Sequence, residues 1–285
     1  MTVIAMTREL GSLGQDVAAA VATQLNLHII HHERFEHNLA ERLGAKGSAV
    51  HRYLEGEANL LERWRIDRHK LSRCTTEEVL EQAVRGDVVI RGWGGISLLR
   101  SVPHVLRVRV CAPLTIRIER LMERIGLSDP GVARREIERS DAAEARTVED
   151  MFGGDWRSAE LHHIVLNTEH LSSAACASQL STLAQDDGFR ETDTSKQLLD
   201  DLLVTTRVQI ALERVFGMHH HIAVMIEDGE VVLTGMAGSG DVALQAAGIA
   251  RGVKGVRHVT HTMVETRPSQ DSRSSFGGRL PWKAT

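Results

Sequence analysis

Short apolar runs and longer amphipathic stretches alternate along the first two thirds of the chain. The apolar runs are rich in β-branched residues and lie at residues 2–7, 27–30, 88–90, 104–111 and 164–167. The stretches between them carry apolar residues at helical spacing and lie at 16–25, 75–85, 114–124, 129–151 and 172–184. Alternating strands and helices predict a parallel sheet with helices on both faces. We therefore expect an α/β domain over residues 1–184.

The order of elements changes after a polar segment at 185–196, which we interpret as a linker. The elements that follow are a helix at 198–216, strands at 222–226 and 231–235, a helix at 242–251 and a strand at 256–264. Asp228-Gly229 is a hairpin turn signal between the first two strands. This αββαβ order predicts a small α+β domain at 197–266, which we expect to fold on its own. The expected core stripe of its first helix is Leu198, Leu202, Leu203 and Ile210.

Composition narrows the class of protein. A net charge of −4 over 285 residues gives no electrostatic case for a nucleic-acid binder. Three scattered cysteines, with no CxxC, argue against a zinc ribbon or disulfide framework and fit a reducing, cytoplasmic setting. No apolar stretch is long enough to span a membrane, and the tail at 267–285 is expected to be disordered. Consecutive histidines, as at 219–221, point to opposite faces of a strand, so we expect no metal site.

The loop between the first strand and the first helix carries the first candidate chemistry. Its sequence is RELGSLGQD, residues 8–16, and α/β proteins that bind nucleotides cradle phosphate at this point. The residues expected to bind nucleotide are Arg8, Gly11, Ser12, Gly14 and Gln15. Gln15 stands where a P-loop has lysine, so Arg8 is expected to supply the positive charge. The other interpretation is a tight strand–helix turn without a ligand.

Several segments, in order, resemble the cytidylate kinase-like family. TRELGSLGQDVA is similar to the opening S-R-E-x-G-S-G-G-R-E-I-A of that family, and VVIRGWGG to its V-I-x-G-R-G-A. VRVCAPLTIRIERL is similar to its V-x-A-P-x-x-x-R-x-x-R, and HHIVLNTEHLS to its Y-D-L-V-I-N-T-x-x-L-S. The resemblance covers about 1–184. It implies a P-loop kinase fold with a mobile lid, and phosphoryl transfer from ATP, as its Mg²⁺ complex, to a nucleoside monophosphate such as CMP.

The resemblance also assigns roles to residues outside the loop. It implies substrate contacts at Glu33 and Trp93, although Trp93 is equally suited to core packing. In the segment that resembles the lid, Arg139 and Arg146 are expected to contact phosphate, with Asp141 orienting them. The alternative for this segment is a solvated helix with i,i+4 ion pairs.

Departures from the family pattern leave a second function open. Gln15 and Trp93 each replace an arginine of the family, and His31 replaces an aspartate. These changes favour a nucleotide-sensing regulatory protein that has lost turnover. A purely structural assembly protein is a third alternative.

The C-terminal segment resembles a BON domain. The matching features are Gly229 in a turn, the strand 231–235 that ends in V-x-L-x-G, and GVRHV at 255–259. The resemblance implies binding of a phospholipid or another ligand. We expect this module to sense a lipid or protein ligand, or to assemble the chain into a homo-oligomer, and to carry no catalytic residue.

Overall fold

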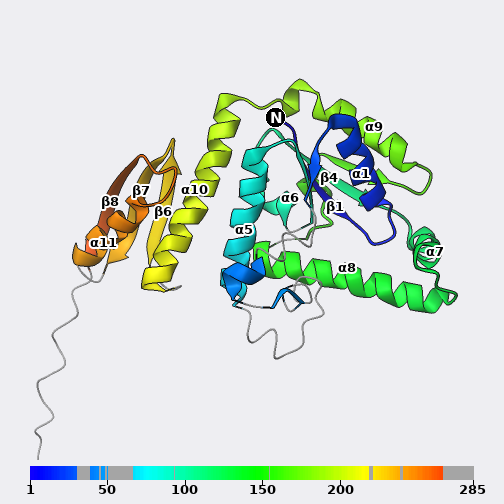
Figure 1. The fold of residues 1–285 in the computed structure, drawn as a ribbon, viewed down its shortest axis with the longest axis horizontal. Coiled ribbons are helices and arrows are strands. Elements are labelled where there is room, and N and C mark those ends of the chain that lie inside the picture. Colours follow the sequence, from blue (N-terminus) through cyan, green and yellow to red (C-terminus); the bar gives the residue numbers. More distant parts are fainter. Residues whose placement is uncertain are drawn as a thin grey trace, which may run out of the picture. The chain divides into compact units, whose positions relative to one another are not determined.

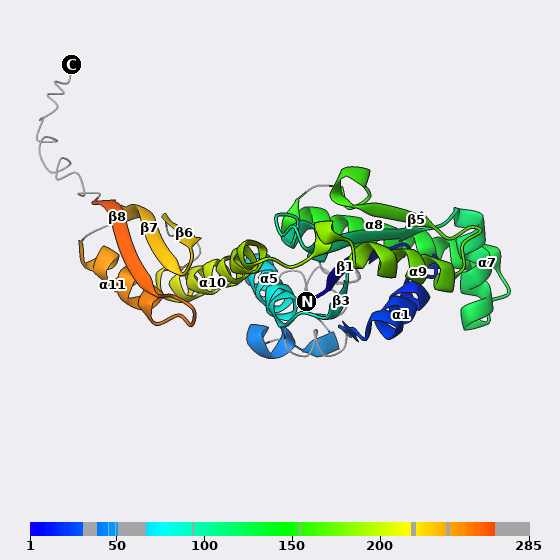
Figure 2. The same ribbon diagram turned by 90° about the horizontal axis from the view of Figure 1, so that it is seen from above.

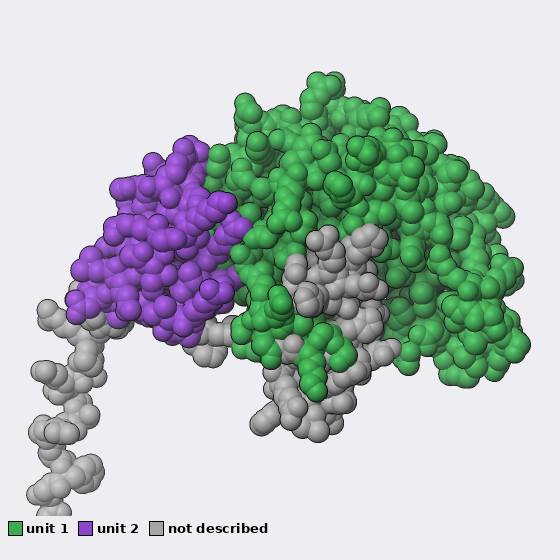
Figure 3. Space-filling view, viewed as in Figure 1, with its two compact units in different colours: residues 1–206 green, residues 207–285 purple. Residues whose placement is uncertain are grey.

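The structure is a computed structural model. It describes residues 1–30, 39–44, 46–48, 50, 67–92, 94–153, 155–217, 221–237 and 240–265. The predicted substrate residues Glu33 and Trp93, and the predicted tail 267–285, lie outside these ranges. The chain separates into two compact units, residues 1–206 and 207–285, which Figure 3 shows in two colours.

A five-stranded parallel sheet forms the centre of the first unit (Figure 1). Its strands are β1 (Val3–Arg8), β2 (His28–Ile29), β3 (Val88–Arg91), β4 (Val105–Cys111) and β5 (Ile164–Asn167). They lie in the order β2-β3-β1-β4-β5, so the first strand of the chain is the central one. Every neighbouring pair is parallel. The predicted α/β fold is confirmed.

Alternating residues of β1 supply two separate cores. Ile4 and Met6 pack with α1 (Gly14–Leu25) and α9 (Ser173–Ala184) on one face of the sheet. Val3 and Ala5 pack with α5 (Arg68–Arg85) and α6 (Gly95–Leu98) on the other. Figure 2 shows α1 and α9 close together. Because both faces of β1 are buried, the strand is a continuous apolar run rather than an alternating one.

The remaining helices of the first unit have identifiable starts. The helix α7 (Leu114–Ile125) follows β4 after Pro113, and α8 (Pro130–Phe152) begins where Asp129 accepts the amide hydrogen of Gly131. Short 3₁₀ turns lie at Ala159–Leu161 and Asp187–Phe189. The start predicted at residue 75 was wrong, because α5 begins seven residues earlier, after Asp67. The carboxylate of Asp67 accepts the amide hydrogens of residues 69 and 70, which satisfies two donors of the first turn.

The second unit contains a three-stranded mixed sheet. Its elements are β6 (Ile222–Glu227), β7 (Glu230–Ala237), α11 (Gly240–Arg251) and β8 (His258–Glu265). β6 and β7 pair antiparallel, and β8 joins β7 in parallel after α11. Asp228 and Gly229, with φ of 51° and 72°, form the turn between β6 and β7. Two consecutive positive φ angles match the twist of the strands that they connect, so the predicted hairpin is confirmed.

The helix α10 (Asp193–Phe216) contributes residues to both units. It starts inside the segment that we interpreted as a linker. Leu199 and Leu203 pack in the core of the first unit, whereas Leu198 of the predicted stripe is 37% exposed. The predicted stripe was therefore wrong in two respects. It included the exposed Leu198 in place of the buried Leu199, and it assigned Leu203 to the core of the C-terminal domain instead of the first unit. The contact boundary falls after Thr206, and the predicted limits at 184 and 197 remain predictions.

The described helices include none that combines the length and the apolarity needed to cross a bilayer.

Replacing Leu199 by alanine tests this role of α10. Leu199 is fully buried, so Leu199→Ala should lower the free energy of unfolding of the first unit by about 2–5 kcal/mol, through lost burial and the cavity left behind. Leu198→Ala is the matched control, with an expected loss below about 1 kcal/mol. Urea denaturation of the full chain measures both. Equal losses would contradict the packing of α10 described above.

Candidate functional site

The loop of residues 9–13, between β1 and α1, is tightly packed. Gly11 has a φ of +81°, and a Cβ atom there would lie 2.7 Å from the carbonyl oxygen of Arg117. Leu13, which precedes α1, is also left-handed, with φ of 61°. Ser12 is fully buried, and its hydroxyl has no hydrogen-bond partner among the described residues. The loop thus presents an unsatisfied hydroxyl beside a helix N-terminus, where backbone amides attract anions.

Two arginines lie at the carboxyl ends of adjacent strands beside this loop. Arg8 ends β1 and packs against Gly14. A Cβ atom on Gly14 would lie 2.5 Å from the Cβ atom of Arg8. Arg91 ends β3, and residue 6 of β1 is its partner in the sheet. Burial, and secondly the positive charge of Arg8, lower the pKa of Arg91. Arg8 was predicted from the sequence and Arg91 was not, although its place at the end of a buried strand was a signal.

A stripe of three arginines on α7 lies along the same loop. Arg117, Arg120 and Arg124 are spaced three and four residues apart, so they share one face of the helix. Arg117 Nη1 donates to the carbonyl oxygen of Leu10 at 3.4 Å, and Arg124 Nη2 lies 3.2 Å from Oδ1 of Asp16. The two outer arginines of the stripe therefore contact the two ends of the segment 10–16. Arg120 contacts Thr168, described below.

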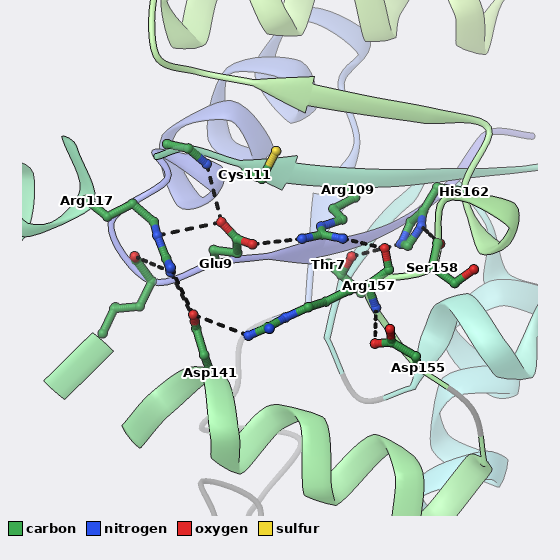
Figure 4. A network of polar contacts seen from close by, with 12 residues as sticks. Thr7, Glu9, Arg109, Cys111, Arg117, Asp141, Asp155, Arg157, Ser158 and His162 are labelled. Carbon is green, nitrogen blue, oxygen red and sulfur yellow. Dashed lines mark hydrogen bonds and ion pairs between the residues drawn. The ribbon is translucent and has the colours of Figure 1, made fainter. Parts of the chain in front are cut away.

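Glu9 connects the central strand to β4 and α7 (Figure 4). Its Oε1 lies 2.8 Å from Nη2 of Arg109. Its Oε2 accepts the amide hydrogen of Ala112 at 3.3 Å and lies 3.6 Å from Nε of Arg117. Glu9 and Arg117 are both buried, at 8% and 7% exposed. A buried carboxylate needs such partners to remain charged.

Asp141 of α8 completes the network from the other side. Its two carboxylate oxygens accept from Nη1 and Nη2 of Arg117 at 3.1 and 2.9 Å, a bidentate geometry. Nη2 of Arg157 lies 3.5 Å from Asp141 Oδ2. Arg117 therefore joins the loop carboxylate, Glu9, to a carboxylate of α8.

An aromatic ring and a histidine extend the network. The guanidinium groups of Arg109 and Arg157 each lie 5.3 Å from the ring centre of Trp156, which is 2% exposed. These are cation–π distances. His162 donates through Nδ1 to the carbonyl oxygen of Ser158 at 2.8 Å, and its Nε2 lies 3.1 Å from the hydroxyl of Thr7. Burial is the largest cause that lowers the pKa of His162, so the neutral ring accepts from Thr7.

The predicted site residues divide into two groups. The five expected nucleotide contacts, Arg8, Gly11, Ser12, Gly14 and Gln15, all lie at the loop, with Gln15 exposed. Asp141 connects to them through Arg117, not by orienting Arg139 or Arg146 as expected. Arg139 is exposed and contacts Glu136 at 3.0 Å, and Arg146 is exposed as well. Since residues two apart on a helix differ by about 200°, Asp141 and Arg139 face opposite ways.

Three residues of the network, Glu9, Arg109 and Arg157, were not predicted from the sequence. Glu9 stands next to Arg8 in the loop, and its signal was an acidic residue directly after a buried strand. Arg109 lies in β4, where arginine and valine alternate over residues 107–110. In the part of the chain that the structure describes, no group of three or more His, Cys, Asp or Glu residues is placed to hold a metal ion.

Removing one partner of the Arg117 pair should be costly. Asp141→Asn leaves a buried guanidinium without its bidentate carboxylate, so we expect a loss of about 3–5 kcal/mol in the free energy of unfolding. Glu136→Gln is the matched control on the same helix, because its ion pair with Arg139 is exposed and should contribute less than about 1 kcal/mol. Urea denaturation compares the two variants. A loss below about 1 kcal/mol for Asp141→Asn would contradict the network as described.

Comparison with solved structures gives likenesses of low sequence identity. A crystal structure of an uncharacterized protein from Eubacterium ventriosum has 16% identity and a TM-score of 0.50, and the match covers 65% of this chain and 99% of that one. At this identity it bears on the fold alone. Shikimate kinase from Acinetobacter baumannii, in complex with shikimate, has 14% identity and a TM-score of 0.36, covering 64% and 92%. Shikimate kinase from Bacteroides thetaiotaomicron has 15% identity and a TM-score of 0.37, covering 65% and 99%.

Two family models match the sequence, at the positions of the two resemblances. The model of the BON domain matches residues 200–268, and the model of the cytidylate kinase-like family matches residues 3–170. No curated protein matches the chain. The match to the cytidylate kinase-like family spans more than half of the 285 residues, and the chain therefore belongs to that family, with a BON domain after the kinase-like part.

Proposed function

We propose that the protein is a nucleoside monophosphate kinase that transfers the terminal phosphoryl group of ATP, bound as its Mg²⁺ complex. The observation that carries this proposal is the loop at the N-terminus of α1. Its buried Ser12 hydroxyl lacks a partner among the described residues, and Arg8 and Arg91 flank it. An oxyanion such as a phosphate would accept hydrogen bonds from the hydroxyl and from the free amides of the first helical turn.

The reaction places specific demands on this chain. A phosphate oxygen of the acceptor attacks the terminal phosphorus of ATP, and the bond from that phosphorus to the ADP oxygen breaks. Negative charge spreads over the transferred group and the leaving ADP, so cations placed beforehand accelerate the transfer. Gln15 cannot supply this charge. We assign the task to Arg8 beside the loop, and to Arg120 and Arg124 of the α7 stripe.

The expected contributions of Arg139 and Arg146 remain part of the proposal in a modified form. Both lie exposed on α8, away from Asp141, so they would reach a nucleotide only from the solvent side of that helix. Asp141 has a different task here, since it holds Arg117 rather than either of them. Glu33 and Trp93 remain the proposed acceptor contacts on the strength of the family motifs.

A nucleotide-sensing regulatory protein is the second candidate, favoured by the first turn of α1. Its exposed glutamine is neutral, and Val17, near the place of the magnesium-binding hydroxyl of a P-loop, is fully buried. In this version the loop binds nucleotide without turnover. The BON domain, in both versions, is proposed to bind a lipid or protein ligand or to assemble the chain into a homo-oligomer.

A paired measurement separates the two functions. We expect calorimetry to detect binding of ATP, and a coupled assay of ATP consumption to detect turnover with at least one nucleoside monophosphate. Binding without turnover for every monophosphate would favour the sensor. Absence of ATP binding would overturn both versions.

Gln15→Lys should increase turnover. It adds one cation at an exposed position, and a preorganised cationic contact to the transferred group contributes roughly 3 kcal/mol, or about a hundredfold in rate. Ala19→Lys is the matched control, since it adds the same charge to an exposed position one turn further along α1, and it should leave the rate unchanged. A parent rate of about 10–100 per second would contradict the claim that Gln15 limits turnover.

A further inference from the structure

Thr168, directly after β5, is fully buried and contacts the loop between β1 and α1. Its hydroxyl donates to the carbonyl oxygen of Ser12 at 2.8 Å and accepts from Nη1 of Arg120 at 2.9 Å. Its own carbonyl oxygen accepts from Nη2 of Arg120 at 2.7 Å. One guanidinium group therefore holds both oxygens of Thr168, and the threonine in turn holds the backbone of the loop.

Holding the Ser12 carbonyl fixes the direction of the next amide. In a trans peptide the carbonyl oxygen and the following N–H lie in one plane and point in opposite directions, and the described chain has no cis peptide bond. With the oxygen turned toward Thr168, the N–H of Leu13 points the other way. Leu13 is the residue before α1, so its amide and those of the first turn form a set of donors without intrahelical acceptors.

The loop also needs external support at this peptide. Leu13 adopts a left-handed conformation, with φ of 61°, which leucine disfavours because its Cβ approaches the carbonyl oxygen. Such conformations persist where the surroundings hold them in place. The hydrogen bond from Thr168 acts on the peptide directly before this residue.

Resting on the proposed function, we infer that Thr168, held by Arg120, is a positioning residue for the phosphate site. It makes no contact with phosphate itself. It sets the Ser12–Leu13 peptide so that the amide donors face the anion, and it brings the charge of Arg120 next to the loop. Thr168 and Arg120 come from segments 48 residues apart, so neither position alone indicates this role.

Three variants of the full chain test the inference. Thr168→Val keeps the shape of the side chain and removes the hydroxyl, and Thr168→Ser keeps the hydroxyl. Thr206→Val is the matched control, because Thr206 is buried and its hydroxyl donates to the carbonyl oxygen of Leu202 within α10, far along the chain from the loop. Calorimetry with ATP and with inorganic pyrophosphate, beside thermal melting, gives the readout.

We expect Thr168→Val to weaken the binding of both ligands by about tenfold or more, the equivalent of one hydrogen bond. Thr168→Ser should bind within about threefold of the parent, and Thr206→Val should bind as the parent does. If Thr168→Val binds as tightly as the parent, the inference is wrong. It is also wrong if Thr206→Val, or Thr168→Ser, loses as much affinity as Thr168→Val. A parent chain that binds neither ligand would overturn the proposed function, and this inference with it.

Discussion

A carboxylate held between two guanidinium groups is the constraint on which the carboxyl edge of the sheet depends. Glu9 directly follows the central strand and is buried. An unpaired charge is unfavourable in such a place, so Arg109 and Arg117 must stay beside it. Arg117 in turn is neutralised by Asp141 of α8. One chain of ion pairs therefore fixes the loop, the first turn of α7 and the middle of α8 relative to one another. A shift of any one of these segments would leave a buried charge without its partner.

This chain of charges changes what each arginine is available to do. Arg117 has two carboxylate partners and is buried, so its charge serves the fold. Arg120 and Arg124, on the same face of α7, are partnered by neutral oxygens of Thr168 and by a half-exposed aspartate. Arg120, whose named partners are neutral oxygens, retains its positive charge close to the loop, whereas Asp16 partly offsets the charge of Arg124. In the proposed reaction these side chains supply part of the positive charge that the neutral Gln15 lacks, from beside the loop rather than from the first turn of α1.

The fold was largely predictable, because strands buried on both faces give unbroken apolar runs that stand out from the helices between them. The loop was predictable as well, since glycines between a first strand and first helix have a known structural meaning. The partner of Asp141 was not, because spacing along a helix shows which residues share a face and not what lies opposite. Helix α10 was misassigned for a related reason: Leu198 and Leu199 are both apolar, and only the packing distinguishes the buried one.

The tautomer of His162 makes the network sensitive to acid. Its Nδ1 carries the proton that Ser158 accepts, so any added proton must go to Nε2, and the hydrogen bond with Thr7 must then reverse. The new cation would lie near Arg109 and Arg107, whose charges already lower the pKa of the ring after burial. Since the folded pKa lies below the unfolded value of about 6.5, the folded state takes up this proton less readily than the unfolded chain. The stability that the neutral ring contributes is complete above that value and declines as the pH falls from it toward the folded pKa, so acidification weakens the network at His162.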